Sequence, residues 1–571
     1  MTIPHNRIVL LLRVMAIALG AANAGAAMAA QSMGHEGVNY LDQADAWFRG
    51  DWSTAVNGTW SPLYPLLLGI AMRVIRPSAS MEFPLVHAVN FVLYILALFA
   101  FEFFWKQVSD RYYARDDGDD VLPRWALTSL GYALFVWTSL CVIRLFVVAP
   151  DMLVAALVFL ASGWLLCLTS GRMTARTTVL LGATLGAMCL AKAFTFPVAI
   201  LALLVAGLLF VRIGQRGRVL AAAAGFAIVT VPFVVALSRD AGRVTLGDVF
   251  RVTYLKYVLN APFPHYRDGS PDIDGTPEHP MDGSATTPPV IQYDAGMPVT
   301  YAPLYDQGYW FAGLSQTFRP GLQWRATATN LERYTGLFLR LEGLVLAWLV
   351  ALVIFRGRRK VAMESWVLGG IAVAAFATYS VVYVEDRYVA PFIVLLWAAA
   401  LLFVKLPAAP HHPAWLRASS VVMLAGFAFN IGVFHLDGLN ALIGFAPSAV
   451  GGPVSANDTG PDRPTDVALA TGELGLSPGD RIGIIGDALH ASWARLARFR
   501  IVAAVAPADA AAFWRGSSDD RAAVLRVFEA MQVRAVFAVN PPADSPLSGW
   551  TRLGDTHVYV HVSTRALPAT R

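Results

Sequence analysis

Three aspartates in one short polar stretch are the first residues in this chain that suggest chemistry. The stretch NYLDQADAWFRGDW, residues 39–52, contains Asp42, Asp45 and Asp51. If residues 40–48 are helical, Asp42 and Asp45 stand three positions apart and share one face of the helix. A carboxylate in such a position can act as a general base toward a hydroxyl or amine. The alternative is that these acids are solvated or cap helices.

Three further charged positions interrupt apolar runs. Asp151, in VVAPDMLVAAL, follows a proline at a helix start, so it is either an N-cap or a second functional carboxylate. Lys192, in CLAKAFTFP, is costly at a membrane edge unless it is paired, so it either binds a lipid phosphate or snorkels to headgroups. Arg387, in VYVEDRYVAPF, either binds a phosphate bidentately or forms an internal Arg–Asp pair that orients its loop.

The composition indicates that a bilayer surrounds most of the chain. Of 571 residues, 56% are hydrophobic and 15% are charged, whereas soluble domains carry about 25% charged residues. The formal net charge of +5 is small, and the lysines and arginines lie in short loops between apolar runs, so nucleic acid is not an expected partner. The three cysteines, each in an apolar run, are expected to be inert packing residues.

Stretches of about 18 or more apolar residues predict transmembrane helices. We expect eleven, at 8–30, 83–105, 125–143, 152–170, 177–191, 195–211, 219–237, 337–355, 364–384, 389–404 and 418–436. The apolar segment 60–75 is not counted, because counting it would put every basic loop outside, against the positive-inside rule. It is expected to be an amphipathic helix at the membrane interface.

This topology places the long segments 31–82, 238–333 and 437–571 on the outer face of the membrane. The N-terminal run predicts an uncleaved first helix, with a cleavable signal peptide as the alternative. The first loop with its aspartates, Asp151, Lys192 and the loop of Arg387 all fall on the same outer face, around one expected cavity. The chain is therefore expected to be a multi-pass protein of the bacterial inner (plasma) membrane that works on the periplasmic or extracellular side.

The last part of the chain has the alternation of a small α/β domain. Strands are predicted at 481–486, 500–505, 534–539 and 557–562, and helices at 488–499 and 519–531. The expected domain organisation is a transmembrane catalytic module over 1–436, a linker over 437–464 and a periplasmic α/β domain over 465–571. The turn GIIGDA is a poor match to a dinucleotide fingerprint, so a periplasmic cap is favoured over a nucleotide site.

The sequence resembles the membrane-embedded GT-C glycosyltransferases, in particular the branch of protein mannosyltransferases and aminoarabinose transferases (families 39 and 83). The resemblance rests on YLDQADAWFRGDW, WSPLYPLLLG, APDMLVAAL, LAKAFTFP and EDRYVAPF, which follow the family's order over roughly residues 1–400. It implies a mostly α fold, a GT-C-like bundle of about eleven transmembrane helices, to which the small C-terminal α/β domain is added.

The resemblance also implies roles for individual residues. Asp42 would be the catalytic base, with Asp45 as its neighbour or substitute, and Asp151 would be a second acidic residue near the donor or acceptor. Lys192 and Arg387 would bind the donor phosphate, with Tyr388 lining that pocket. Many relatives carry adjacent acids in the first loop, whereas Asp42 and Asp45 are separated, so the choice of base stays open between them.

No cofactor is required in principle, because a phosphodiester-linked sugar already has a good leaving group. A divalent metal is the alternative, for which His279 beside Glu278 is the sign; His265 lies in the same loop, 238–333, and has no assigned role. The metal site is not the favoured interpretation.

The expected function is transfer of a hexosyl or pentosyl group from a polyprenyl-phosphate-linked donor to a glycan, lipid or protein acceptor. Membrane lipids are further expected partners, because they would surround the transmembrane helices. A lipid-linked saccharide flippase or transporter is the first alternative, although most charges lie at helix ends, with Glu102, Arg340 and Glu342 as exceptions. A non-catalytic assembly protein of the envelope glycan is the second.

Overall fold

The computed structural model describes residues 4–31, 33–114, 122–262, 273–281, 283–293, 295–354, 362–403, 421, 425 and 463–563, without the side chains of 339–354. The chain forms two compact units, each built from three separate stretches. The first unit contains Met1–Ala26, Ala88–Leu246 and Phe318–Val450, and the second contains Ala27–His87, Gly247–Thr317 and Gly451–Arg571.

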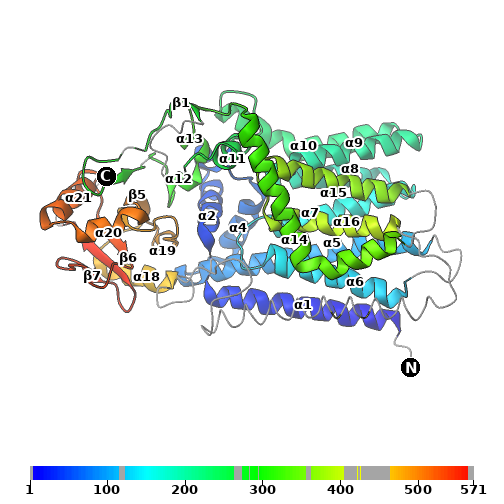
Figure 1. Ribbon diagram of the computed structural model, residues 1–571, viewed down its shortest axis with the longest axis horizontal. Helices are drawn as coiled ribbons and strands as arrows, with labels where there is room; N and C mark the ends of the chain where they lie inside the picture. The colour runs from blue at the N-terminus through cyan, green and yellow to red at the C-terminus, as the bar shows by residue number, and fades with distance from the viewer. Residues whose placement is uncertain are drawn as a thin grey trace. The chain divides into compact units, whose positions relative to one another are not determined.

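The first unit is an array of apolar helices that run side by side (Figure 1). Its helices are α1 (His5–Ala30), α5 (Ala79–Tyr113), α6 (Arg124–Val136), the π-helix η1 (Trp137–Ile143), α7 (Asp151–Thr169), α8 (Ala175–Ala191), the 3₁₀ turn η2 (Ala193–Thr195), α9 (Phe196–Arg212), α10 (Gly217–Asp240), α14 (Pro320–Ile354), α15 (Met363–Val382) and α16 (Asp386–Phe403). The first turns of α5 and the end of α1 belong to the second unit.

Eight helices in the described part of the chain are long and apolar enough to cross a membrane, so the chain is a multi-pass membrane protein. They match the predicted spans 8–30, 83–105, 125–143, 152–170, 195–211, 219–237, 364–384 and 389–404. The predicted span 177–191 corresponds to α8 (Ala175–Ala191), a shorter apolar helix, and the predicted span 337–355 lies in α14 as far as Ile354, where that stretch of described residues ends. The predicted span 418–436 lies outside the described residues, apart from two positions.

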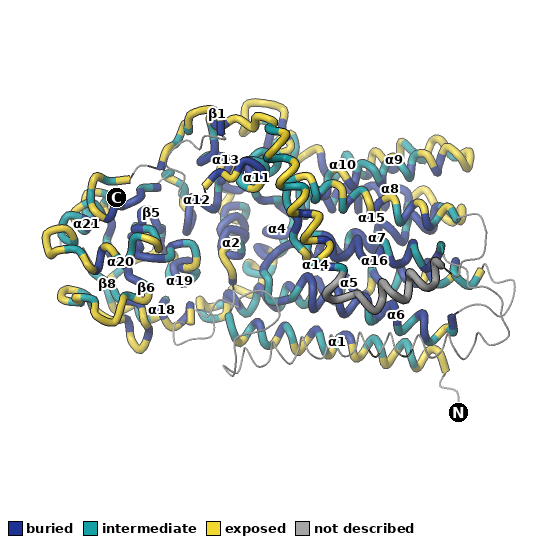
Figure 2. The backbone as a smooth tube through the Cα atoms, in the orientation of Figure 1, coloured by how far each residue is buried: buried dark blue, intermediate teal, exposed yellow. Residues whose placement is uncertain are grey.

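The helices differ in how far they are covered by the rest of the unit (Figure 2). In α7, 78% of the apolar window is buried, whereas in α10 only 17% is buried. Leu204 and Leu208 of α9 and Leu220 and Ile228 of α10 are more than half exposed. Exposed leucines of this kind are expected where lipid takes the place of water, so α7 lies inside the bundle and α9 and α10 form its edge.

Small residues allow two helices of the bundle to approach closely. A Cβ atom added to Gly225 of α10 would lie 2.2 Å from the backbone oxygen of Val179 in α8. One added to Gly182 of α8 would lie within 2 Å of the backbone oxygen of Ala222. Glycines at such contacts let helix backbones pack directly against each other in membranes. In agreement with this, the contact between α8 and α10 is extensive.

The second unit combines short helices with a mixed sheet. Its elements are α2 (Gly34–Arg49), α3 (Trp52–Ala55), α4 (Leu63–Ile75), α11 (Val249–Tyr257), β1 (Asp274–Gly275), β2 (Ile291–Gln292), α12 (Ala302–Tyr305), α13 (Gln307–Trp310), β3 (Leu314–Ser315), α18 (Pro464–Ala470), η4 (Thr471–Leu474), β4 (Arg481–Ile485), α19 (Trp493–Leu496), β5 (Arg500–Val505), α20 (Pro507–Arg515), α21 (Ser518–Ala530), β6 (Ala535–Val539), β7 (Thr551–Arg552) and β8 (Val558–Val562). All three segments predicted to be external therefore contribute to this unit.

The larger sheet has the order β2-β5-β4-β6-β8-β7, with β4 parallel to both β5 and β6. Helices α20 and α21 cover one face through Phe513, Trp514, Val524 and Phe528. On the other face, Trp493 of α19 packs against Phe537 of β6, with ring centroids 4.7 Å apart. The predicted α/β alternation is confirmed, and β2 adds an edge strand from the long loop before α14 that sequence analysis did not predict.

The predicted helix over 488–499 is wrong for most of its length. Only Trp493–Leu496 is helical, because the carboxylate of Asp487 accepts hydrogen bonds from the backbone N–H groups of Leu489 and His490. Such a local side-chain contact offers the backbone an alternative to the helix.

Near the N-terminus of the second unit, the predicted helix over 60–75 is confirmed as α4. Its Gly69 lies against Phe48 of α2, while Ile70 and Val74 are exposed. Its location at a membrane interface stays a prediction.

Candidate active site

The predicted phosphate-binding residues come together within the first unit. Asp151 is the first residue of α7, Lys192 follows the last turn of α8, and Arg387 and Tyr388 lie in the first turn of α16. Asp151 was expected either to be the N-cap of α7 or to act in a site. The N-cap is Pro150, and Asp151 is the first helical residue. The carboxylate of Asp151 pairs with Lys192 and Arg387.

Two cations share the carboxylate of Asp151. Nζ of Lys192 lies 2.5 Å from Oδ1, and Nη1 of Arg387 lies 3.5 Å from Oδ2. Arg387 also pairs with Glu385 of its own loop, at 3.2 Å from Nε to Oε1, whereas the pair expected within the loop was with an aspartate. Asp151 is 2% exposed. The carboxylate of Asp151 therefore binds two cations, and Arg387 divides its contacts between Asp151 and Glu385.

The ring of Tyr388 forms one wall of this cluster. Nζ of Lys192 lies 3.3 Å from the ring centroid, and Cζ of Arg387 lies 5.2 Å from it. A cation over an aromatic face is stabilised by the ring quadrupole. The ring therefore helps to hold both cations, and the role of Tyr388 in a phosphate pocket stays a prediction.

Arg144 adds a third cation beside the same loop. It has a left-handed backbone, with φ of 70°, directly after the π-helix η1. Left-handed non-glycine residues and π-helical turns are uncommon and concentrate at functional positions. Its guanidinium interacts electrostatically with Glu385 and Asp386. The sequence does not single out Arg144, because a single arginine after an apolar run gives no sign of its backbone conformation.

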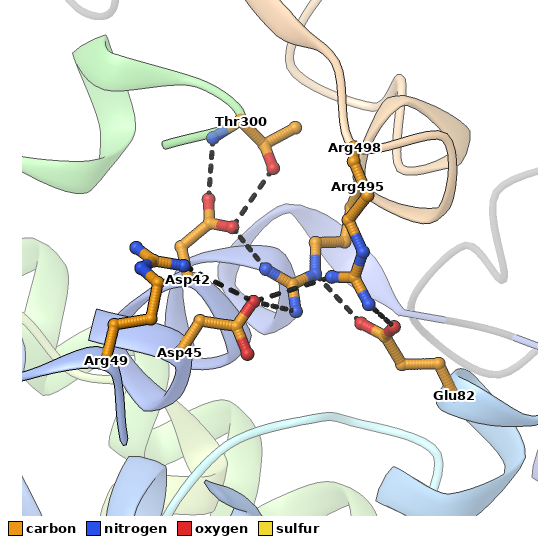
Figure 3. Close-up of polar contacts among 7 residues, drawn as sticks. All are labelled: Asp42, Asp45, Arg49, Glu82, Thr300, Arg495 and Arg498. Carbon is orange, nitrogen blue, oxygen red and sulfur yellow. Dashed lines mark hydrogen bonds and ion pairs between the residues drawn. The ribbon is translucent and has the colours of Figure 1, made fainter. Parts of the chain in front are cut away.

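The predicted base Asp42 and its neighbour Asp45 lie in the second unit, in a cluster with Glu82, Arg495 and Arg498 that we call the arginine–carboxylate cluster (Figure 3). Helix α2 is confirmed, and Asp42 and Asp45 share one of its faces, as their spacing predicted. Glu82 comes from the first turn of α5, and both arginines come from the connection between β4 and β5.

Arg495 is at the centre of the arginine–carboxylate cluster. Its Nη1 lies 2.7 Å from Oδ1 of Asp42, its Nη2 lies 2.7 Å from Oδ2 of Asp45, and its Nε lies 2.8 Å from Oε1 of Glu82. Arg498 also contacts Glu82 and lies 3.5 Å from Asp45. Asp42, Glu82 and Arg495 are each at most 4% exposed, so these charges compensate one another with little help from water.

Thr300 completes the surroundings of Asp42. Its backbone N–H donates to Oδ2 of Asp42 at 2.8 Å, and its hydroxyl donates to Oδ1 at 3.1 Å. Burial raises the pKa of Asp42, while the Arg495 guanidinium and the Thr300 N–H act in the opposite direction. Burial would lower the pKa of Arg495, but Glu82, Asp42 and Asp45 together hold that pKa above its usual value.

The third aspartate of the first loop has a structural role. Asp51 is the N-cap of α3, where its carboxylate accepts from the backbone N–H of Thr54 at 3.2 Å. The hydrogen bond from the Thr54 side chain lowers the pKa of Asp51. Of the alternatives for these acids, capping therefore applies to Asp51, whereas Asp42 and Asp45 bind Arg495.

The residues suggested as metal ligands are not assembled into a site in the described part of the chain. No group of three or more His, Cys, Asp or Glu residues there could hold a metal ion. The His279 ring stacks on Tyr309, with ring centroids 3.7 Å apart and an angle of 3° between the planes. His265 lies outside the described residues. Asp42, Asp45 and Glu82 each pair with Arg495, and Asp45 and Glu82 also pair with Arg498.

These two units give the chain a GT-C-like fold. The solved structures similar to this chain include ArnT, an aminoarabinose transferase, from Cupriavidus metallidurans bound to undecaprenyl phosphate. That match has 14% sequence identity, covers 98% of this chain and 99% of ArnT, and has a TM-score of 0.50. The same protein in the apo state matches with 13% identity, 97% of each chain and a TM-score of 0.47.

The likeness is one of fold, since the sequences have diverged widely. No protein-family description matches the sequence, and no curated protein matches it either.

Proposed function

We propose that this protein is a membrane glycosyltransferase that moves a sugar from a polyprenyl-phosphate-linked donor to an acceptor. The observation that carries the proposal is the pairing of Lys192 and Arg387 on the buried Asp151, in a chain with the fold of ArnT. The ArnT structure contains undecaprenyl phosphate, and a lipid phosphate is an anion for which such cations are suited.

Lys192 and Arg387 hold the donor phosphate in this proposal. A lysine is a compact point charge and an arginine is a planar donor fork, and both stabilise the negative charge that develops as a phosphate leaves. Asp151 keeps both cations in place before the donor arrives. When phosphate oxygens bind, they share these cations with Asp151, and Arg144 supplies further positive charge beside the loop.

Asp42 is the proposed base, with Asp45 as the alternative. The acceptor hydroxyl or amine transfers its proton to the carboxylate of Asp42 as it attacks the anomeric carbon. The bond from that carbon to the phosphate oxygen breaks, and the polyprenyl phosphate leaves as an anion. Burial supports this assignment, because a carboxylate with a raised pKa is a stronger base than an exposed one. Asp45 is about one-third exposed.

The proposed location is the inner (plasma) membrane, with transfer on the periplasmic or extracellular side. The basic loops between spans and the positive-inside rule support this orientation. The acceptor is a glycan, a lipid or a protein, and no metal is required for the proposed chemistry. A protease-protection assay on membrane vesicles tests the orientation, because cleavage in the C-terminal segment from the outer side agrees with it and protection contradicts it.

The experiment that tests the activity is sugar transfer in membranes that contain the wild type or Asp42→Asn at equal expression. Radiolabelled undecaprenyl-phosphate mannose and undecaprenyl-phosphate aminoarabinose serve as donors, with the membrane's own acceptors. Label that leaves the donor in wild-type membranes, and remains on it in the Asp42→Asn membranes, supports the enzyme and its base. Full transfer by Asp42→Asn rejects Asp42 as the base and makes Asp45 the next variant.

A second candidate function is transport of a lipid-linked saccharide. The observation that favours it is an ion pair between membrane helices: Arg13 of α1 contacts both carboxylate oxygens of Glu102 in α5 at 2.8 Å, and Tyr132 donates to Glu102. Ionisable groups within spans often mark transport routes. Donor that changes leaflet without losing its sugar, in vesicles containing the purified protein, would favour the transporter.

A further inference from the structure

The C-terminal α/β fold supplies one of the two groups that bind the carboxylate of Asp42, and it holds the other by a backbone hydrogen bond. One is Arg495, from the β4–β5 connection. The other is Thr300, whose carbonyl oxygen accepts a hydrogen bond from the backbone N–H of Ile501 in β5 at 2.9 Å. The same threonine donates to both oxygens of Asp42. The sheet therefore fixes both of the groups that orient Asp42.

The contacts of Arg495 fit a role in positioning. Each of its three nitrogen atoms contacts a different carboxylate, on Asp42, Asp45 and Glu82. A guanidinium is a rigid planar fork, so three such contacts determine both its place and its orientation. Asp42 accepts three hydrogen bonds from Arg495 and Thr300, whereas a carboxylate offers about four lone-pair positions. Capacity for one further donor, such as an acceptor hydroxyl, remains.

We infer that Arg495 is a positioning residue that keeps Asp42 ionised and oriented as the base, and that the C-terminal α/β fold is a working part of the catalytic site. The inference rests on the proposed function, because it assumes that Asp42 accepts the proton of the acceptor. It goes beyond that proposal by assigning a task to residues 463–563, which sequence analysis interpreted as a cap.

The physical reason is that a base must be ionised to take up a proton. Asp42 is 4% exposed, and burial disfavours the charged form of a carboxylate. The guanidinium of Arg495, in direct contact, favours the charged form and opposes that effect. Without Arg495, Asp42 would be left beside Asp45 and Glu82 and would take up a proton at higher pH.

The other charged and titratable groups around Asp42 do not replace Arg495. On α2, Asp45 repels the charge of Asp42, and Arg49 lies 3.9 Å from Asp45. Glu82 of α5 is anionic when it pairs with both arginines. In the β4–β5 connection, after α19, Arg498 contacts Asp45 and Glu82. Tyr305 of α12 interacts with Asp42, which raises the pKa of that phenol beyond the effect of burial.

The test is the pH dependence of sugar transfer in wild type, Arg495→Gln and Arg498→Gln, measured with radiolabelled undecaprenyl-phosphate mannose and undecaprenyl-phosphate aminoarabinose. Loss of an opposite charge in direct contact raises a carboxylate pKa by about one to three units. The acidic limb of the profile should therefore move to higher pH by that amount in Arg495→Gln, with a loss of rate of roughly tenfold per unit below the new limb. Arg498→Gln removes a charge from the same cluster without removing a contact to Asp42, so its limb should stay in place.

An acidic limb that does not move in Arg495→Gln, while Asp42→Asn is inactive, overturns the inference and leaves the proposed function intact. Full activity of Asp42→Asn contradicts the base assignment itself. If Arg495→Gln does not accumulate in membranes, Arg495→Lys takes its place. A lysine keeps the charge but cannot contact all three carboxylates, so a smaller upward movement of the limb is expected, and an unmoved limb overturns the inference.

Discussion

Nη1 of Arg495 lies 2.7 Å from Oδ1 of Asp42, although 453 positions of sequence separate the two residues. The guanidinium thereby joins a helix near the start of the chain to the connection between two strands of the C-terminal sheet. Since Asp42 and Arg495 are almost fully buried, removing either one leaves the other as a buried charge with fewer partners. The pair thus holds α2 against the β4–β5 connection, and it also influences the ionisation of Asp42.

Asp42→Asn is expected to reduce sugar transfer by about 10²- to 10⁴-fold, the usual contribution of a general base. The amide keeps the size of the side chain but cannot take up the proton of the acceptor. Asp51→Asn is the matched control on the same loop, because asparagine is also a good N-cap and Asp51 contacts Thr54. Transfer assays on the two variants at equal expression check the prediction, and equal rates in both would contradict it.

The sequence predicts those features of the site that leave a local signal in the chain. Asp42 and Asp45 share a face because helical spacing is a local property, and the structure confirms it. Asp151, Lys192 and Arg387 stand out in sequence because charges are rare next to apolar runs, and the structure brings the three together. The roles of all five residues in catalysis stay predictions.

The partners that come from far along the chain leave no such local sign. Arg495, in ASWARLARFR, has the pattern of an ordinary surface arginine, and Glu82 resembles an acid in the first turn of a span. Thr300 belongs to a loop rich in proline and polar residues. Their importance arises from three segments that meet in one unit, which helical or strand periodicity does not encode.

Lys192→Met is expected to weaken binding of undecaprenyl phosphate and to destabilise the fold. Removing one partner of a buried ion pair costs about 3–5 kcal/mol, although Arg387 would compensate for part of the Asp151 charge. The double variant Lys192→Met with Asp151→Asn should recover thermal stability without recovering lipid binding. Lys106→Met, which removes an exposed lysine paired with Asp110, is the control. Recovery of both properties in the double variant would show that Lys192 only neutralises Asp151.

Lys256 is expected to make the free energy of unfolding increase as the pH rises above about 8. Burial lowers the pKa of Lys256 to about 8, against the opposing effect of Glu36, whereas an unfolded lysine titrates near about 10.4. Between these values the unfolded chain holds a proton that the folded chain has released, so this group makes the free energy of unfolding rise with pH. Below pH 8 both states are protonated and the contribution is constant.

Thermal unfolding of wild type and Lys256→Met between pH 7 and pH 10 checks this prediction. The variant removes the titrating group, so the stability of the wild type relative to the variant should increase as pH rises through the window above about 8. The loss of the contact between Lys256 and Gln307 affects the variant equally at each pH and does not produce a slope. A constant difference across the whole range would show that Lys256 titrates normally in the folded protein.

Gly225→Ala is expected to separate α8 from α10 and to lower the thermal stability of the bundle. The new Cβ would lie 2.2 Å from the backbone oxygen of Val179, a distance that requires one helix to move, because a backbone atom cannot rotate away. Overpacking of this kind costs about 1–3 kcal/mol. Gly370→Ala in α15 is the matched control, since no atom lies within 4 Å of its added Cβ. Thermal denaturation in detergent should show a clear loss for Gly225→Ala and little change for Gly370→Ala. Equal stability of the two variants would mean that α8 and α10 are not held at the close distance described.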